Sequence, residues 1–200
     1  MITVQKAKSI IDQYLNQLDS EMVLINESSS RIINHNLEAT FPSPRFDNSA
    51  MDGFAVRSVD TIGASQEHPV SLKVIGISSA GAPSDLTLNA GECIQCMTGA
   101  SIPNGADAVV IVEHTSGFSD NDTVHVFEET HSRKHIRKKG EEIQKGDSLI
   151  VRGTRVTPSE IGVLTSFGFR KISVTKKPQI AIFGTGDELI EPGETLDDGQ

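Results

Sequence analysis

The most informative stretch of this sequence for fold and function is DNSAMDGFA, from Asp47 to Ala55. Two carboxylates, an amide and a hydroxyl lie within its first six residues, and Gly53 permits a sharp turn before the apolar residues Phe54 to Val56. Asn, Asp and Ser side chains hydrogen-bond readily to nearby backbone groups, so such clusters usually serve turns. The residues alone therefore favour a turn leading into a strand, and a binding or catalytic site is the alternative.

The region around this stretch, from Pro42 to about Thr130, indicates short strands joined by turns. Polar and apolar residues alternate in Val70–Val74 and in Val124–Val126, as expected of strands with one buried face. Ala108–Val112 is a continuous apolar run, which is typical of a strand covered on both faces. We therefore predict a compact β-rich domain here.

Two helices are predicted outside this region. Apolar residues recur every three or four positions from Thr3 to Leu18, which indicates an amphipathic helix. Thr157, Pro158 and Glu160 form a capping box with proline at the first helical position, and Gly168 can end this second helix. We expect the two helices to pack together, which would make the β-rich region an insertion within one domain.

A third unit is expected to begin at Pro178. Gln179–Phe183 reads as a short apolar strand, and Gly184–Glu188 as a polar loop at its carboxyl end, where ligands bind in parallel α/β sheets. The chain reaches Gln200 before any helix could cover this strand, so we expect this unit to be truncated. The loop lacks the third glycine of a dinucleotide fingerprint, because Leu189 occupies that position.

Charge and composition exclude several classes of function. The net charge of −9 argues against a general nucleic-acid binder. No apolar run approaches the roughly 20 residues of a membrane span, and the N-terminus has no signal-peptide core, so a soluble cytoplasmic protein is expected. The basic run Arg133–Lys139 is either a solvated face or a patch that attracts anions.

Cys93 and Cys96 have the spacing of some zinc and redox sites. No second pair of cysteines accompanies them, and positions i and i+3 of a strand face opposite sides. We therefore predict that both cysteines pack in the interior. The six histidines show no ligand spacing, and none is assigned to a metal.

Four stretches, in the same order, resemble the motifs of the MoeA family, which includes the catalytic domain of gephyrin and its plant counterpart. One short match would say little, whereas four collinear matches between residues 46 and 199 are specific. In chain order they are Asp47–Ala55; Ile94–Ala100 with Pro103, Gly105, Ala106, Asp107 and Val109; His135–Ile143 with Gly146 and Asp147; and Thr185–Leu189 with Pro192 and Gly193.

The chain departs from the family pattern at three positions and in length. Phe54 stands where the family usually has Tyr, Glu142 where the third motif commonly has Asp, and Gly184 where Ser or Pro is usual. Family members are much longer, so most of the molybdopterin-binding domain and a C-terminal β domain would lie outside this chain.

The resemblance implies a mixed α and β fold. It would have a small helix-plus-strand dimerisation domain formed by residues 1–43 and 140–176, with an inserted β-rich domain at 44–139. Residues 177–200 would be the first strand and loop of an α/β molybdopterin-binding domain.

The resemblance also implies an activity. The family inserts molybdenum from molybdate into adenylylated molybdopterin and releases AMP, with a divalent cation. A Mg²⁺-dependent transferase is therefore expected, as a homodimer supplied by a molybdopterin adenylyltransferase, with this chain inactive by itself. Mg²⁺ prefers carboxylate and phosphate oxygens and can polarise a pyrophosphate toward cleavage.

The matching motif positions give the expected site. Asp52, Thr98 and Glu188 would be catalytic, with Thr98 donating a hydrogen bond to substrate or oxyanion. Metal ligands would be Asp52, Glu142 and Glu188. Residues expected to contact the cofactor are Ser49, Arg137, Thr185, Gly186 and Asp187.

Two other functions compete with this one. A non-catalytic dimerisation or scaffold module of the same family is disfavoured by the presence of Asp52, Thr98 and Glu188, because a scaffold does not need them. An anion- or RNA-binding module built on Arg133–Lys139 is opposed by the overall acidity and the few aromatic residues for base stacking.

Overall fold

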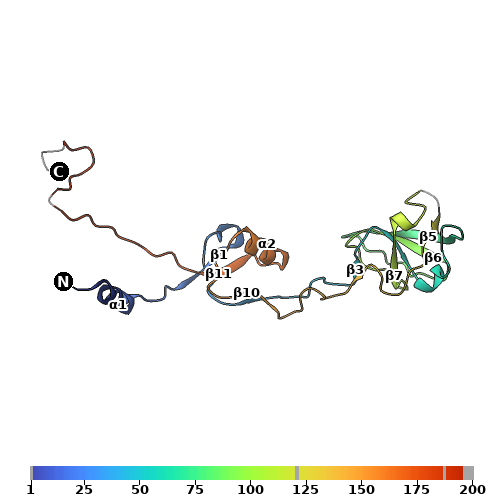
Figure 1. The fold of residues 1–200 in the computed structure, drawn as a ribbon, viewed down its shortest axis with the longest axis horizontal. Coiled ribbons are helices and arrows are strands. Elements are labelled where there is room, and N and C mark those ends of the chain that lie inside the picture. The colour runs from blue at the N-terminus through green and yellow to red at the C-terminus, as the bar shows by residue number, and fades with distance from the viewer. Residues whose placement is uncertain (1, 120–121, 187, 196–200) are drawn as a thin grey trace. The chain divides into compact units, whose positions relative to one another are not determined.

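The computed structural model describes residues 2–119, 122–186 and 188–195, and the chain divides into two compact units (Figure 1). The first unit comprises Met1–Asn36 and Ile150–Gln200, and the second comprises Leu37–Leu149. The expected insertion, residues 44–139, lies inside the second unit. The fold is mixed α and β, as expected, with two α-helices and a five-stranded sheet among the described residues.

The second unit is built on that sheet, whose strand order is β7-β4-β6-β5-β8. The strands predicted in this unit at Val70–Val74, Ala108–Val112 and Val124–Val126 are confirmed, although β5 continues to Ser78 and β7 ends one residue early at Ile111. Only β5 and β6 run parallel. The strands are β4 (Gly53–Val56), β5 (Val70–Ser78), β6 (Glu92–Cys96), β7 (Ala108–Ile111) and β8 (Thr123–Val126).

The sheet curls until its two edges meet. After β7 and the short helix η3 (Val112–His114), Thr115 forms a bridge with Val126 of β8. The Ser116 amide donates to the His125 carbonyl at 2.8 Å, and the Phe127 amide donates to the His114 carbonyl at 2.9 Å. These bonds satisfy backbone groups that an open edge would leave exposed.

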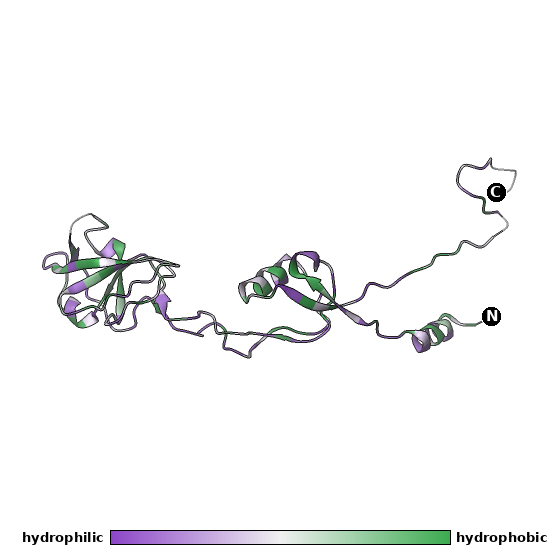
Figure 2. Ribbon diagram, turned by 180° about the vertical axis from the view of Figure 1, so that it is seen from behind, coloured by the Kyte–Doolittle hydropathy of each residue, from purple (hydrophilic) through white to green (hydrophobic). Residues whose placement is uncertain are grey.

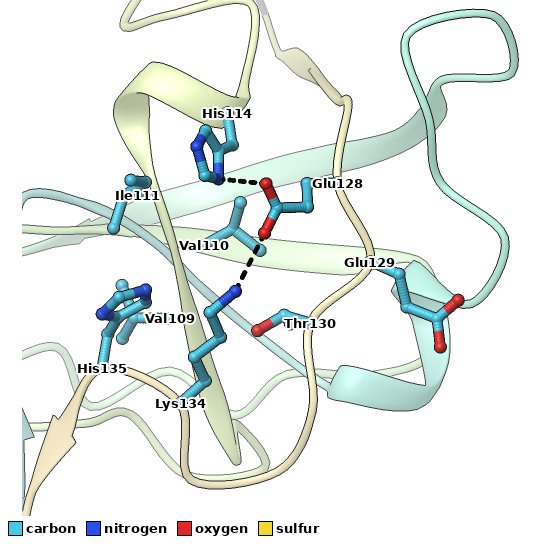
Figure 3. Close-up of a pocket in the computed structure, with 9 residues that line it drawn as sticks. All are labelled: Val109, Val110, Ile111, His114, Glu128, Glu129, Thr130, Lys134 and His135. Atoms are coloured by element: carbon cyan, nitrogen blue, oxygen red, sulfur yellow. Dashed lines mark hydrogen bonds and ion pairs between the residues drawn. The ribbon is translucent and has the colours of Figure 1, made fainter.

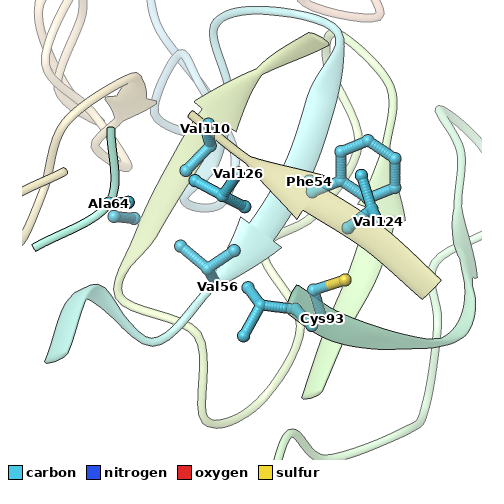
Figure 4. Close-up of a cluster of buried hydrophobic side chains, with 9 residues drawn as sticks. Phe54, Val56, Ala64, Cys93, Val110, Val124 and Val126 are labelled. Carbon is cyan, nitrogen blue, oxygen red and sulfur yellow. The ribbon is translucent and has the colours of Figure 1, made fainter. Parts of the chain in front are cut away.

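The interior of this curled sheet holds an apolar core (Figure 4). The side chains of this core come from alternate positions of the strands, because every second residue of a strand points inward. Its buried members are Phe54, Val56, Ala64, Leu72, Cys93, Ala108, Val110, Val124 and Val126. Val109, which faces the other way, is also fully buried, so β7 is covered on both faces as its sequence predicts.

Two short antiparallel pairs complete the second unit. β2 (Leu37–Glu38) pairs with β10 (Ser148–Ile150), and β3 (Asn48–Ser49) pairs with β9 (Ile136–Arg137). The short helix η2 (Ser58–Thr61) follows β4.

In the first unit, β1 (Ser20–Leu24) pairs with β11 (Lys171–Thr175), and α2 (Pro158–Ser166) packs beside the short helix η1 (Ile25–Glu27). The predicted capping box of α2 is confirmed: the Thr157 side chain accepts from the Ser159 amide, and Glu160 accepts from the Thr157 amide at 2.8 Å. Gly168 follows with φ +79°.

The N-terminal helix α1 (Val4–Tyr14) is shorter than predicted, and its expected packing against α2 is wrong. None of its residues is buried, and its apolar stripe stays exposed, with Ile11 at 59% and Leu15 at 69%. Figure 2 shows hydrophobic and hydrophilic residues on this one helix. An amphipathic pattern predicts an apolar face but does not identify what covers it.

The strand predicted at Gln179–Phe183 is also wrong. Residues 176–186 form no helix or strand, and Ile182 is 91% exposed. A strand needs neighbours to take up its backbone hydrogen bonds, and no described part of the chain pairs with this segment. No helix among the described residues has both the length and the apolarity that a membrane span requires.

Candidate functional site

The candidate site lies at one end of β4, where three of the four motif stretches meet. In the antiparallel pairing of β4 with β6, Gly53 lies opposite Cys96. Asp52 immediately precedes β4 and Thr98 follows β6 by two residues, so this register brings them together across 46 positions of sequence.

Thr98 binds one oxygen of the Asp52 carboxylate through two donors. The Thr98 amide and its hydroxyl each donate to Asp52 Oδ1, at 2.7 Å. The hydroxyl bond and then the amide bond lower the pKa of Asp52, because both stabilise the charged carboxylate. Asp52 is therefore ionised at neutral pH and suited to attract a cation rather than to donate a proton.

The other oxygen of Asp52 remains available. Asp52 is exposed, and its Oδ2 makes no hydrogen bond with the described residues. The Thr98 hydroxyl is expected from its motif to donate to the substrate or to an oxyanion. In the structure it donates to Asp52 instead. In this arrangement Thr98 orients Asp52 and lowers its pKa, and the catalytic roles of both residues stay predictions.

Gly53 contributes close packing rather than the expected sharp turn. Its backbone is not in the left-handed region, and it pairs with Ile111 of β7. A side-chain carbon here would overlap the carbonyl oxygen of Val110 and lie 2.9 Å from the Ile111 Cα. Only glycine lets β7 approach β4 so closely, and this contact fixes the position of the preceding Asp52.

Ser49 has a supporting role in the structure. It is fully buried, its hydroxyl donates to the Met51 carbonyl at 2.5 Å, and its own carbonyl accepts from the Gly99 amide at 2.9 Å. These bonds hold the turn before Asp52 against the loop that carries Thr98. A buried hydroxyl does not favour the expected direct contact with a cofactor.

The third motif joins the site through β9. Arg137 lies opposite Asn48 in the β3–β9 pair, and the Ala50 amide donates to the His135 carbonyl at 2.9 Å. The Arg137 side chain is exposed. Its expected contact with the cofactor stays a prediction, and its position beside the first motif is compatible with it.

Two members of the basic run are held in ion pairs. Lys134 Nζ lies 2.9 Å from Glu128 Oε1, and the other oxygen of Glu128 lies 2.8 Å from His114 Nδ1 (Figure 3). The bond from Lys134 lowers the pKa of Glu128, whereas burial lowers the pKa of the neighbouring His135. Arg133 pairs with Asp47 at 2.8 Å. The run is therefore partly neutralised rather than wholly free for anions.

The carboxylates expected to bind a metal belong to both units: Asp52 and Glu142 lie in the second unit and Glu188 in the first. Glu142 is exposed and accepts a 3.2 Å hydrogen bond from the Ser43 hydroxyl. Over the described ranges, no three His, Cys, Asp or Glu side chains are grouped so as to hold a metal ion. The described residues by themselves do not fit a Mg²⁺ site, and the assignment of Asp52, Glu142 and Glu188 to a metal stays a prediction.

The fourth motif belongs to the first unit, and Thr185, Gly186 and Glu188 are all exposed there. The Glu188 carboxylate folds back over Gly186, so closely that a side-chain carbon at position 186 would overlap it. Asp187 lies outside the described residues. The expected roles of this loop stay predictions.

Both cysteines are free and buried, as predicted, on opposite faces of β6. Cys93 belongs to the sheet core, and Cys96 packs with Ala55 and Ala100. Burial raises the pKa of Cys93 to about 12 and that of Cys96 to about 11. The thiolate required for metal or redox chemistry is therefore disfavoured.

Sequence reasoning assigned no role to two acidic residues that organise this region. Asp107 accepts from the Ser58 amide at 2.6 Å and from the Ser58 hydroxyl at 2.8 Å. Asp47 binds two distant points of the basic run. Asp47 and Asp107 both belong to the quoted motifs, and this membership could have marked them as functional residues. Their hydrogen-bond partners depend on tertiary structure and could not be found in the same way.

Comparisons with known proteins identify the family to which the sequence is similar. Residues 2–168 match the family described as MoeA N-terminal region (domain I and II). The chain is 38% identical over 196 residues to the molybdopterin molybdenumtransferase of Staphylococcus aureus (strain Mu50), covering 96% of this chain and 46% of that protein. It is 38% identical over 201 residues to the enzyme of the same name from Bacillus subtilis (strain 168), covering 100% of this chain and 47% of that protein.

A crystal structure of the molybdopterin biosynthesis moeA protein from Pyrococcus horikoshii OT3 is similar in fold. The TM-score is 0.85 at 31% sequence identity, over 97% of this chain and 51% of that chain. The chain thus spans about half the length of the relatives it matches.

Proposed function

Because this chain belongs to the MoeA family, we propose that it supplies the N-terminal part of a molybdopterin molybdenumtransferase, the name of its relatives. The complete enzyme would transfer molybdenum from molybdate to adenylylated molybdopterin and release AMP. Since the chain spans about half of those relatives, the remainder of the active site would come from chain beyond the matched part.

The Asp52–Thr98 pair carries this proposal. Two hydrogen bonds fix one carboxylate oxygen and lower the pKa of this exposed group, while the other oxygen has no hydrogen bond to the described residues. A fixed negative charge of this kind serves a reaction in which a cation must be held against phosphate oxygens.

A chimera tests the proposal directly. In it, this chain replaces the matching part of the Bacillus subtilis relative, and AMP release from adenylylated molybdopterin is followed with and without molybdate and Mg²⁺. We expect molybdate-dependent release that requires Mg²⁺. Asp52→Asn should slow it about 10²-fold, the usual cost of removing a preorganised electrostatic group.

The matched control is Asp85→Asn, which makes the same change of charge at an exposed residue of the same unit. It should leave the rate unchanged. If the Asp52→Asn chimera releases AMP as fast as the unsubstituted one, Asp52 has no part in the reaction and the proposal loses its main support.

We also propose that the protein works as a homodimer. Large apolar residues of α1, Val4 and Ile11 among them, are exposed, and burying them against a second copy would remove that surface from water. Sedimentation of the chain with Ile11→Glu, compared with the unsubstituted chain, should show weaker self-association. Equal association constants would contradict this use of α1.

A further inference from the structure

One carboxylate holds both ends of the basic run. Asp47 Oδ2 accepts from Arg133 Nη1 at 2.8 Å, and Asp47 Oδ1 accepts from the Lys139 amide at 2.9 Å. Arg137 lies between these two anchors and is exposed. Asp47 therefore closes the segment 133–139 into a loop that projects the Arg137 guanidinium.

Other contacts also reach the loop: the Arg133 amide donates to the Asp107 carbonyl at 2.7 Å, the Lys134 carbonyl accepts from the Val109 amide at 3.1 Å, and the Lys138 amide donates to Glu141 at 2.7 Å. Of these and the Asp47 bonds, only the Asp47 carboxylate joins the two ends of the segment. β9 contains only Ile136 and Arg137, so its ladder with β3 is short. Arg133 and His135 have φ values of +72° and +58°, a region that side-chain-bearing residues seldom adopt. A loop with such backbone angles and so short a ladder depends on contacts from outside it.

Asp47 also connects the loop to the second motif. Its carbonyl accepts from the Ile102 amide at 3.1 Å, close to the segment that carries Thr98. The Lys139 amide bond and the Arg133 bond lower the pKa of Asp47, because both stabilise its charged form. Asp47 thus links the Arg137 loop to the stretch that positions Asp52.

We propose that Asp47 is a positioning residue, which holds the loop 133–139 so that Arg137 is presented to an oxyanion of the substrate. This rests on the proposed function for the choice of anion, which is either a phosphate or molybdate. Asp47 itself does not touch that anion, because both of its oxygens are occupied by the loop.

The first experiment measures the loop without any catalytic readout. In the 200-residue chain, Asp47→Ala should speed hydrogen exchange of the Lys139 amide about tenfold, which is the effect of losing a charge-assisted hydrogen bond. Trypsin should cut after Arg137, Lys138 and Lys139 faster by a similar factor. Asp85→Asn is the control for lost negative charge and should change neither rate.

A second variant distinguishes the loss of these loop contacts from general unfolding of the chain. Arg133→Met removes the ion pair but keeps the Asp47 carboxylate for the Lys139 amide, and it should raise tryptic cutting with less change in Lys139 exchange. If both Asp47→Ala and Arg133→Met leave the loop as protected as in the unsubstituted chain, Asp47 does not hold it and the proposal is overturned.

The second experiment measures the anion. The Arg137 Nε–H signal is followed by NMR while AMP is added in one series and sodium molybdate in another. We expect a saturable shift in the unsubstituted chain, weakened about fivefold or more by Asp47→Ala and abolished by Arg137→Gln. The series that shows the shift identifies the phosphate or the molybdate as the ligand.

The outcomes separate this inference from the proposed function. No shift with either anion, or equal affinities in the Asp47→Ala and unsubstituted chains, would overturn the positioning role. An inactive chimera would instead remove the proposed enzymatic function, while the loop and anion measurements would still decide what Asp47 does.

Discussion

Hydrogen bonds from Thr98 lower the pKa of Asp52, and this is testable with a single isosteric substitution. Thr98→Val removes the hydroxyl donor but keeps the amide donor, so the pKa of Asp52 should rise toward its ordinary value without reaching it. A ¹³C carboxyl titration by NMR measures this directly. Thr165→Val, at an exposed residue of α2 outside the site, should leave the Asp52 titration unchanged. An unshifted Asp52 in Thr98→Val would mean that the hydroxyl bond does not form in solution.

Gly53 and Gly162 should respond to alanine with opposite signs. Gly53→Ala forces a side-chain carbon into the β7 backbone, so the second unit should lose about 1–3 kcal/mol of unfolding free energy, as overpacked interiors do. Gly162 lies in α2 with open space around it, so Gly162→Ala should stabilise the first unit by about 0.4–1 kcal/mol. Urea unfolding of each variant measures both. A neutral Gly53→Ala would show that β7 does not approach β4 so closely.

At the level of elements, α2 depends on its N-terminal cap. Thr157→Ala removes the hydroxyl that accepts from the Ser159 amide, and should cost about 1 kcal/mol of stability. Thr165→Ala makes the same chemical change at an exposed position inside the helix. Because alanine has the higher helix propensity, it should be neutral or stabilise by a few tenths of a kcal/mol. Equal effects of the two substitutions in urea unfolding would mean that the cap contributes nothing specific.

Elements whose signals are local could be predicted from the sequence. The cap of α2 uses residues three positions apart, and the strand at Ala108–Ile111 follows from an uninterrupted apolar run. The segment Gln179–Phe183 has an equally apolar run, but a strand forms only with a partner, and the sequence of the segment carries no information about that partner.

Two residues that the structure brings together, Asp52 and Thr98, could be named from the sequence, but the contact between them could not. The motif positions identify Asp52 and Thr98, whereas the bond between them follows from the register that places Gly53 opposite Cys96. Register depends on the packing of both faces of a sheet and is not encoded in either strand alone. For the same reason the role of Asp47, which acts across 86 and 92 positions of sequence, could not be predicted.

For the whole molecule, stability should fall as the pH drops below about 4, where unperturbed carboxyl groups begin to take up protons. Hydrogen bonds lower the pKa of carboxylates in both units. Each such group contributes stability that is fully present above its unfolded pKa and is lost as the pH falls through its folded pKa. The carboxylates with lowered pKa are Asp47, Asp52, Glu92, Asp107, Glu128 and Glu160.

Thermal unfolding between pH 7 and pH 2 measures this dependence. The Asp47→Ala variant should show a shallower loss of melting temperature in acid than the unsubstituted chain, because one of the linked groups is gone. Parallel curves for the two proteins would show that Asp47 has the same pKa in the folded and unfolded states.

The exposed segment Gln179–Phe183 has a consequence for handling the protein. Ile180, Ile182 and Phe183 are 78%, 91% and 84% exposed, within a stretch that contains no charge and no proline. Short uncharged segments rich in such residues stack readily into cross-β aggregates. Lys176, Lys177 and Pro178 stand directly before it, where charges and proline oppose stacking. We therefore expect that removing these flanking residues, by Lys176→Ala and Lys177→Ala, would speed fibril formation in concentrated solutions of the chain.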